Sequence, residues 1–363
     1  MPGEKRGWLF VIAIMMLMLS AACSKKEKTI EEPVAPEPEI EENLVAMDEP
    51  EEIEEPEEEG MLLYPSPFTG VLNEDEVLAR PVLATINNHP LARPQSGISQ
   101  ADIVYEFLAE GNVTRFLALF QSEQPDKIGP IRSARDYFIH MAKGMDAFYI
   151  AHGYSPDAKA LLDRRYVDNV NGMQYDGTLF KRSHDRKAPH NSYISGENVI
   201  SAMEKTSSSV EIAKTPPFVF HDSVEDAKLG DSASLIVVRF STNNDFINTF
   251  AYDAAEGTYN RTVKGILTVD KEDGEPVEVS NVIVLEAAHR TIDNVGRQAV
   301  DIESGGKVIV FQAGVAKEME WKNIDGFLVP VENGVPAKLV PGRTWIHVVP
   351  THSGISKAVT YTP

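Results

Sequence analysis

Residues 102–122, DIVYEFLAEGNVTRFLALFQS, decide how the first half of this chain folds. Alternating β-forming residues at the start of the stretch predict a strand that carries Glu106 and Glu110 on one face. A Gly-Asn turn signal follows, and 114–122 is again rich in strand formers. The stretch therefore predicts a β-hairpin, and a helix over 99–109 is the competing interpretation.

Strands and helices alternate around this hairpin. Short apolar runs predict buried strands, apolar residues at helical spacing predict helices, and a Ser-Pro-Asp start is typical of a helix N-terminus. The expected elements are strands over 82–86 and 146–153, helices over 132–144, 155–163 and 196–205, and a polar loop over 182–195. This alternation predicts an α/β domain over residues 61–213.

The second half, residues 214–363, has a different sequence pattern. Short runs rich in Val, Ile, Phe and Tyr are separated by turn signals such as KEDGEP, SGG and ENG, and no helix is expected. The pattern predicts a mostly antiparallel β domain, either a sandwich or a partly open barrel. The low-complexity segment 205–217, KTSSSVEIAKTPP, is the expected boundary between the two domains.

Residues 1–23 have the pattern of a secretory signal. Two basic residues precede a short apolar run, which ends in small residues and Cys23, the only cysteine of the chain. A single cysteine cannot form an internal disulfide. The LSAAC end resembles a bacterial lipoprotein signal, which implies that Cys23 is lipidated and anchors the protein to the extracytoplasmic face of the cell membrane.

Residues 24–60 contain sixteen acidic residues, three lysines and five prolines. Such a segment buries little apolar surface and its charges repel, so a disordered tether is expected. The whole chain has a formal net charge of −21, which argues against a nucleic-acid partner. Phosphate-loop and dinucleotide-binding motifs are missing and the histidines are loosely spaced, so neither a cofactor nor a metal site is expected.

The stretch 129–140, GPIRSARDYFIH, is the first candidate site. A helix N-terminus with Arg132 and Arg135 would suit phosphate or carboxylate, with Asp136 and His140 within reach of the ligand. The alternative is a solvated helix face on which Arg132 and Asp136 only pair with each other. Both interpretations stay open.

Other polar residues favour the site interpretation. His152 ends a predicted strand and Asp157 starts a predicted helix, and ligands of open α/β sheets bind at such an edge. The polar loop contributes Arg186 and His190, which would form a lid if the loop folds over the arginines. Arg115, just beyond the hairpin turn, could pair with either glutamate of the preceding strand.

Acidic residues offer a second kind of chemistry. Glu106, Glu110 and Asp136 are the candidate catalytic carboxylates. On one strand face, Glu106 and Glu110 would lie roughly 13 Å apart at their Cα atoms, wider than the roughly 5–9.5 Å between paired glycosidase carboxylates. One buried glutamate could still act as a lone general acid. Two solvated acids on a half-exposed strand are the simpler interpretation.

Several motifs resemble those of the YerB-like lipoproteins of Gram-positive bacteria. They are RPVLATINNHPLARPQSGISQADIVYE, GNVTRFLALFQS, KIGPIRSARDYF, APHNSYIS, NVIVLE and PGRTWIHVVP. The resemblance covers nearly all of residues 61–363 and implies an α/β domain followed by a distinct C-terminal domain. It implies no mechanism.

A second resemblance, in outline only, is to the LytR-CpsA-Psr phosphotransferases, with Asp102, Arg135 and Asp136 at the corresponding positions. The chain lacks their Ser-Asp-Thr triplet. Two hypotheses follow. In one, the protein binds an anionic or glycan ligand of the cell envelope, such as a peptidoglycan glycan or a lipid-linked anion, in an Arg/His-lined cleft, and the β domain contacts an unidentified protein partner. In the other, it is a phosphotransferase or glycan-cleaving enzyme.

Overall fold

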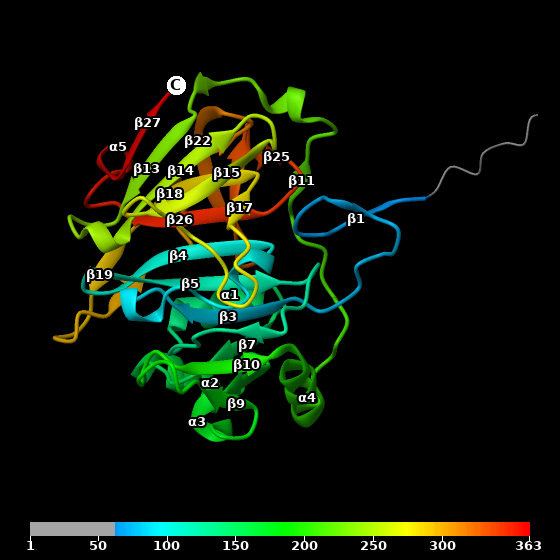
Figure 1. Ribbon diagram of the computed structural model, residues 1–363, viewed down its shortest axis with the longest axis vertical. Helices are drawn as coiled ribbons and strands as arrows, with labels where there is room; N and C mark the ends of the chain where they lie inside the picture. Colours follow the sequence, from blue (N-terminus) through cyan, green and yellow to red (C-terminus); the bar gives the residue numbers. More distant parts are fainter. Residues whose placement is uncertain (1–61) are drawn as a thin grey trace, which may run out of the picture. The chain divides into compact units, whose positions relative to one another are not determined.

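A computed structural model describes residues 62–363 of the chain (Figure 1). The predicted signal peptide, the acidic tether and Cys23 lie outside the described residues. Within the described range, no helix is both long enough and apolar enough to cross a membrane.

One large sheet joins the two halves of the chain. Eleven of its twelve strands follow one another in space, and β12 (Asp231–Ser232) pairs with β22 beside them. The spatial order is β24 (Val335–Pro336), β23 (Phe327–Glu332), β22 (Val315–Ile324), β21 (Gly306–Gln312), β18 (Asn281–Ala287), β26 (Thr344–Pro350), β4 (Ile103–Glu110), β5 (Val113–Phe120), β3 (Val82–Asn87), β7 (Phe148–Ala151) and β8 (Asn169–Asn171). The halves meet where β26 pairs in parallel with β4, side by side in Figure 1.

Two groups of three neighbouring parallel strands in this sheet run in the same direction. β18, β26 and β4 are parallel neighbours, as are β3, β7 and β8. The intervening β5 is antiparallel to both β4 and β3, so the two groups also agree in direction. The carboxyl ends of all six strands therefore lie along one edge of the sheet, where open α/β sheets bind ligands.

The predicted hairpin is confirmed as β4 and β5, and the competing helix over 99–109 is wrong. The prediction that Glu106 and Glu110 share a face is also wrong. The pairing register shifts between Leu108 and Glu110, which marks a β-bulge. Because one extra residue reverses the alternation of side chains, Glu106 and Glu110 fall on opposite faces of the sheet.

The helices are α1 (Asp136–Gly144), α2 (Pro156–Asp163), α3 (Gly172–Tyr175), α4 (Gly196–Thr206) and α5 (Ile355–Ala358), with short 3-10 turns η1 (Pro90–Ala92), η2 (Ile98–Gln100), η3 (Val224–Ala227) and η4 (Asn244–Phe246). The predicted helices over 155–163 and 196–205 are confirmed, and Ser155 caps α2 as its sequence predicts. The expectation of no helix in the second half is wrong, because α5 forms there.

Helix α1 starts four residues later than predicted. Residues 131–135 are extended because they bond to neighbouring strands: the amide of Arg132 donates to the carbonyl of Thr85 (2.8 Å), and Ala134 bridges Tyr154. Arg135 has φ −125° and ψ 152° and occupies the N-cap position. Arg132 therefore lies outside the helix, and the predicted Arg132–Asp136 helical pair does not form.

The remaining strands form a second sheet and small ribbons. The six-stranded sheet contains β16 (Ile266–Leu267), β15 (Thr258–Val263), β14 (Ile247–Asp253), β13 (Leu235–Arg239), β27 (Val359–Thr362) and β17 (Glu278–Val279). The ribbons are β1 (Tyr64–Pro65) with β2 (Leu72–Asn73), β6 (Lys127–Ile128) with β10 (Ser192–Ser195) and β9 (Phe180–Arg182), β11 (Val219–Phe220) with β25 (Lys338–Leu339), and β19 (His289–Thr291) with β20 (Gln298–Val300). The predicted loop over 182–195 is therefore only partly a loop, because β9 and β10 occupy its ends.

The large sheet is buried on both faces. On one face, Phe116 and Trp345 pack with Phe250 of the six-stranded sheet. On the other, Phe107 packs edge-to-face on Phe138 of α1. Each fully buried aromatic side chain contributes about 1.5–3 kcal/mol by leaving water. The polar residues of β4 must therefore find partners within the protein.

Candidate functional site

Polar residues gather at the carboxyl ends of the parallel strands. Asn87 ends β3, Glu110 ends β4 and Asn171 ends β8, while His152 directly follows β7. The extended segment 131–135 runs beside them, since the amide of His152 donates to the carbonyl of Arg132. The sheet topology thus brings the predicted arginines and several predicted polar residues to one edge.

Two buried arginines share the carboxylate of Glu110. Nη2 of Arg135 donates to Oε1 of Glu110 at 2.5 Å, and Nη2 of Arg115 donates to Oε2 at 2.7 Å. Both guanidinium groups are almost inaccessible to solvent, whereas 26% of the Glu110 side chain is exposed. The pairing expected for Arg115 is confirmed, and its partner is Glu110.

This cluster holds more donors than its carboxylate can accept. Two buried polar atoms, Nε of Arg135 and the hydroxyl of Tyr137, have no hydrogen-bond partner within residues 62–363. Burial and the neighbouring Arg135 lower the pKa of Arg115 to about 9. The single carboxylate of Glu110 thus offsets only part of the positive charge of Arg115 and Arg135, and this surplus favours the binding of an anion.

Arg132 lies on the solvent side of the same cluster. Its Nη1 makes a long hydrogen bond of 3.4 Å to the carbonyl of Pro189, and its buried Nε has no hydrogen-bond partner in the described part of the chain. Burial lowers the pKa of Arg132, the charge of Glu110 raises it, and Arg135 lowers it further. Arg132 is therefore the least committed of the three arginines.

A stacked histidine pair lies next to Arg132. The rings of His89 and His190 are 4.6 Å apart at their centroids and nearly parallel. Asn87 holds His190 through Nδ1 at 2.8 Å, and Nδ1 of His89 accepts from the amide of Leu91. Burial and the charge of Arg132 lower the pKa of His89, so its ring is predominantly neutral at pH 7.

His152 is fixed by neighbours on both ring nitrogens. Arg182 lies 3.0 Å from Nε2, and the hydroxyl of Ser192 lies 2.7 Å from Nδ1. Because arginine only donates, Nε2 accepts and Nδ1 carries the proton, so His152 cannot act as a base toward Ser192. A Cβ at Gly172 would lie 2.2 Å from this ring, so only glycine fits beside it.

Four other predicted site residues lie apart from the glutamate–arginine cluster. His140 is exposed on α1 and packs edge-to-face on Tyr166. Arg186 fastens its loop through the carbonyls of Ala92 and Pro94, both at 2.7 Å. Asp136 is half-buried in the first turn of α1, and Asp157 is exposed in the first turn of α2.

Glu106 is fully buried on the opposite face of β4. Its carboxylate accepts hydrogen bonds from Thr114 (2.8 Å), Asn88 (3.2 Å), Asn248 (3.2 Å) and Trp345 (3.3 Å). The guanidinium of Arg261 lies 3.7 Å away, and Nδ1 of His347 lies 3.5 Å away. Donors from both halves of the chain therefore enclose this carboxylate, and no substrate can reach it.

The surroundings of Glu106 perturb two neighbouring groups. Burial lowers the pKa of Arg261 to about 10, although Glu106 acts in the opposite direction. Burial and the charge of Arg261 lower the pKa of His347 well below its usual value. Neither ring nitrogen of His347 has a hydrogen-bond partner among residues 62–363, so the ring is buried in its neutral form.

Sequence reasoning missed two residues of the edge. His89 stands in the INNHP stretch, directly after a predicted strand, and this position could have indicated it. Arg297 comes from the second half: its Nε lies 3.8 Å from Glu110, and the two residues form a backbone bridge. Nothing in the local sequence of Arg297 signals this contact, because it is a bridge between residues far apart in the chain.

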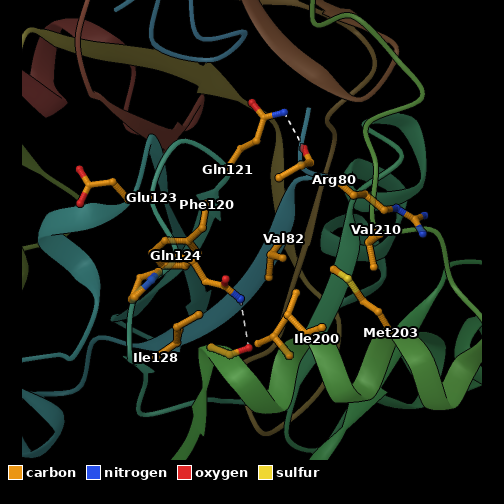
Figure 2. Close-up of a pocket in the computed structure, with 14 residues that line it drawn as sticks. Arg80, Val82, Phe120, Gln121, Glu123, Gln124, Ile128, Ile200, Met203 and Val210 are labelled. Atoms are coloured by element: carbon orange, nitrogen blue, oxygen red, sulfur yellow. Dashed lines mark hydrogen bonds between the residues drawn. The ribbon is translucent and has the colours of Figure 1, made fainter. Parts of the chain in front are cut away.

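The described residues contain no group of three or more His, Cys, Asp or Glu placed to hold a metal ion. A cavity elsewhere, between β3, β5 and α4, has a volume of about 70 Å³. Figure 2 shows its apolar lining, with Gln121 and Gln124 bonded to backbone carbonyls. This volume is well below the roughly 300–1,000 Å³ typical of small-molecule sites, so the cavity is too small for a sugar.

Comparisons with known proteins cover both halves. Residues 68–209 match the N-terminal domain, and 236–346 the C-terminal domain, of a family described as "Protein of unknown function (DUF3048)". "Putative lipoprotein YerB" of Bacillus subtilis (strain 168) is 44% identical over 287 residues, 78% of this chain and 86% of that protein. The crystal structure of the Bacillus subtilis YerB protein superimposes with a TM-score of 0.75 at 41% identity, covering 82% of this chain and 99% of that one.

Proposed function

This chain belongs to the YerB-like family with the two DUF3048 domains, and from that premise we propose that it is an envelope lipoprotein that binds an anionic group of a cell-wall ligand. Cys23 is the proposed lipid attachment site, on the extracytoplasmic face of the membrane. Two arguments support the anchor: the Bacillus subtilis relative is named as a lipoprotein, and the sole cysteine stands at the end of a signal-like segment.

The proposed domain layout remains an α/β domain over 61–213 and a mostly antiparallel β domain over 214–363. The four helices α1 to α4 support the first assignment, and the antiparallel strands β13, β14 and β15 support the second. The large sheet continues across this boundary, because β26 of the second half pairs with β4 of the first.

The surplus of guanidinium groups around Glu110 is the observation that carries the ligand proposal. One carboxylate serves two buried arginines, while Arg132 beside them has no charged partner of its own within hydrogen-bond distance in the described part of the chain. Phosphate or carboxylate can accept from several guanidinium groups at once, with shorter and stronger bonds than neutral acceptors. An incoming anion would therefore complete the cluster.

The position of the cluster supports a binding role as well. It lies at the carboxyl edge of six parallel strands, where the α/β architecture leaves backbone and side-chain donors available. Arg132 and the stacked histidine pair lie on its solvent side, which gives a ligand a route to the buried arginines. We therefore assign the proposed binding site to these residues, in place of the Arg/His-lined cleft that the sequence predicted.

The geometry favours neither enzymatic alternative. Asp102 precedes β4 and Glu110, the partner of Arg135, ends it, so the Cα atoms of Asp102 and Glu110 lie roughly 26 Å apart at opposite ends of the strand. Asp102 is buried and accepts from the amides of Gln121 and Ser122, an arrangement that stabilises the fold. Glu106 and Glu110 lie on opposite faces and cannot form a glycosidase pair.

Arg132 offers the cleanest test of ligand binding. We expect Arg132→Gln to reduce retention on purified cell-wall sacculi at least about fivefold, equivalent to about 1 kcal/mol, because it removes one charge-assisted contact. Arg239→Gln, which removes a partly exposed arginine of β13, is the matched control and should bind normally. Equal retention of wild type and Arg132→Gln would refute the proposed anion site.

A further inference from the structure

A groove of about 770 Å³ lies beside the last strand of the large sheet. Its walls come from the C-terminal end of α2, the strand β8, the short helix α3 and the C-terminal end of α4. A volume between about 300 and 1,000 Å³ is typical of small-molecule sites. The groove is thus large enough for a ligand, unlike the cavity of Figure 2.

Two tyrosines give the groove rigid aromatic walls. Tyr154 packs against the core cluster on one face of the sheet, and Tyr175 packs against the cluster on the other. The ammonium group of Lys159 lies over the ring of Tyr154, 5.6 Å from its centroid. Tyr175 is therefore the ring that remains for a ligand, and the exposed thioether side chain of Met173 lines the groove near it.

Amide groups are among the uncommitted polar groups of the groove, together with the charged side chains of Arg165 and Lys205. Asn169 uses its Nδ2 on the carbonyl of Val167, which leaves its side-chain oxygen free to accept. The exposed amide of Gln174 makes no hydrogen bond within residues 62–363. In contrast, Asp163 is paired with Lys159 and Asp168 with Arg80, so these charges are already matched.

The groove begins next to the arginine segment. Tyr154 forms a parallel bridge with Ala134, and the amide of Ser155 donates to the carbonyl of Ala134 at 3.1 Å. Arg135 is the next residue along the chain. A ligand longer than one sugar unit could therefore place its anionic group at the arginines and its body in the groove.

We propose that this groove binds the sugar units of a glycan that carries amide substituents. A sugar ring presents an apolar face to an aromatic ring and hydroxyl groups around its rim, and an N-acetyl group pairs with side-chain amides through one donor and one acceptor. Tyr175 supplies the aromatic ring, Gln174 an amide donor and Asn169 an amide acceptor. The inference rests on the proposed function, because it assigns the body of the same cell-wall ligand.

An extended peptide is the competing occupant, since β8 is an edge strand. However, β8 has only three residues, and α3 follows it immediately. Such a short edge offers few main-chain hydrogen bonds, and short edge strands are a common protection against strand addition. The aromatic and amide lining therefore favours a glycan.

The test uses an uncharged probe, the β-1,4-linked tetramer of N-acetylglucosamine, titrated into residues 24–363 and followed by calorimetry and NMR. We expect Tyr175→Ala to weaken binding about tenfold, Gln174→Ala about threefold, and Tyr175→Phe little, because the phenylalanine ring keeps the apolar face. Gln174 is exposed, so its variant keeps the groove test valid if Tyr175→Ala fails to fold.

Arg132→Gln separates this inference from the proposed anion site. It should bind the neutral tetramer as wild type does, while its retention on sacculi falls. If the tetramer does not bind wild type although sacculi binding still depends on Arg132, the groove proposal is overturned and the anion site stands. Binding of extended peptides in place of the tetramer, or tetramer binding that survives both groove substitutions, would also overturn it.

Discussion

Glu106 and Glu110 lie four residues apart on the same strand, yet they occupy opposite kinds of environment. Glu106 is fully buried and accepts hydrogen bonds from four side chains. Glu110 is partly exposed and serves two buried arginines that still have unused donors. In the first cluster the acceptor is saturated, whereas in the second the donors are in excess.

The difference shows how a structural charge can be distinguished from a binding charge. A buried carboxylate surrounded by donors stabilises the fold and leaves nothing for a ligand. Buried guanidinium groups that share one acceptor can still gain from a second anion. The β-bulge at the end of β4 creates this contrast, because it turns Glu110 to the face that carries Arg115 and Arg135.

The largest effect is expected from Glu106→Gln. It leaves the buried Arg261 without a counter-charge, and breaking a buried pair costs about 3–5 kcal/mol. Chemical denaturation followed by fluorescence should show this loss. A cost below about 1 kcal/mol would mean that the Glu106 cluster is not the saturated structural network described above.

Part of the pH dependence of stability is expected to come from the Glu106 cluster. His347 is depressed in pKa in the folded state, so the unfolded state binds more protons and stability falls as the pH drops below about 6.5. His347→Leu should reduce this slope without abolishing it, because burial also lowers the pKa of His289 to about 4, while His352→Gln, at an exposed position, should keep the slope.

Glu110→Gln is expected to destabilise the protein by about 1 kcal/mol, less than Glu106→Gln, because Glu110 is partly exposed and solvent screens its pairs. Phosphate should raise the melting temperature of this variant more than that of wild type, since an anion can replace the lost carboxylate on the arginines. Equal phosphate effects in thermal-shift measurements would contradict the idea of donor excess.

Arg132→Gln should have the smallest effect on stability, within about 0.5 kcal/mol, because its guanidinium makes only one long hydrogen bond. The same variant should nevertheless lose anion binding. Denaturation and sacculi retention measured on one preparation sharpen the comparison: a large stability loss together with unchanged binding would place Arg132 among the structural charges.

The local sequence was sufficient for most elements. The hairpin, the cap of α2 and helix α4 follow from nearest-neighbour patterns, because strand alternation, turn residues and capping side chains act within a few residues. The start of α1 was misplaced because the backbone of Arg132 and Ala134 bonds to β3 and to the segment after β7, and these contacts override helical spacing.

The sequence by itself determined which chemical groups are present: an arginine-rich stretch, a lone cysteine after an apolar run, and an excess of acidic residues. The tertiary structure alone decided which of these groups meet. The bulge separates Glu106 from Glu110, the pairing of β26 with β4 places His347 beside Glu106, a separate backbone bridge brings Arg297 to Glu110, and the six-stranded sheet supplies Arg261. The physical reason is that β26 and β4 join residues more than two hundred positions apart, such as Thr344 and Ile103, about which local patterns carry no information, and that strand alternation alone does not reveal a bulge.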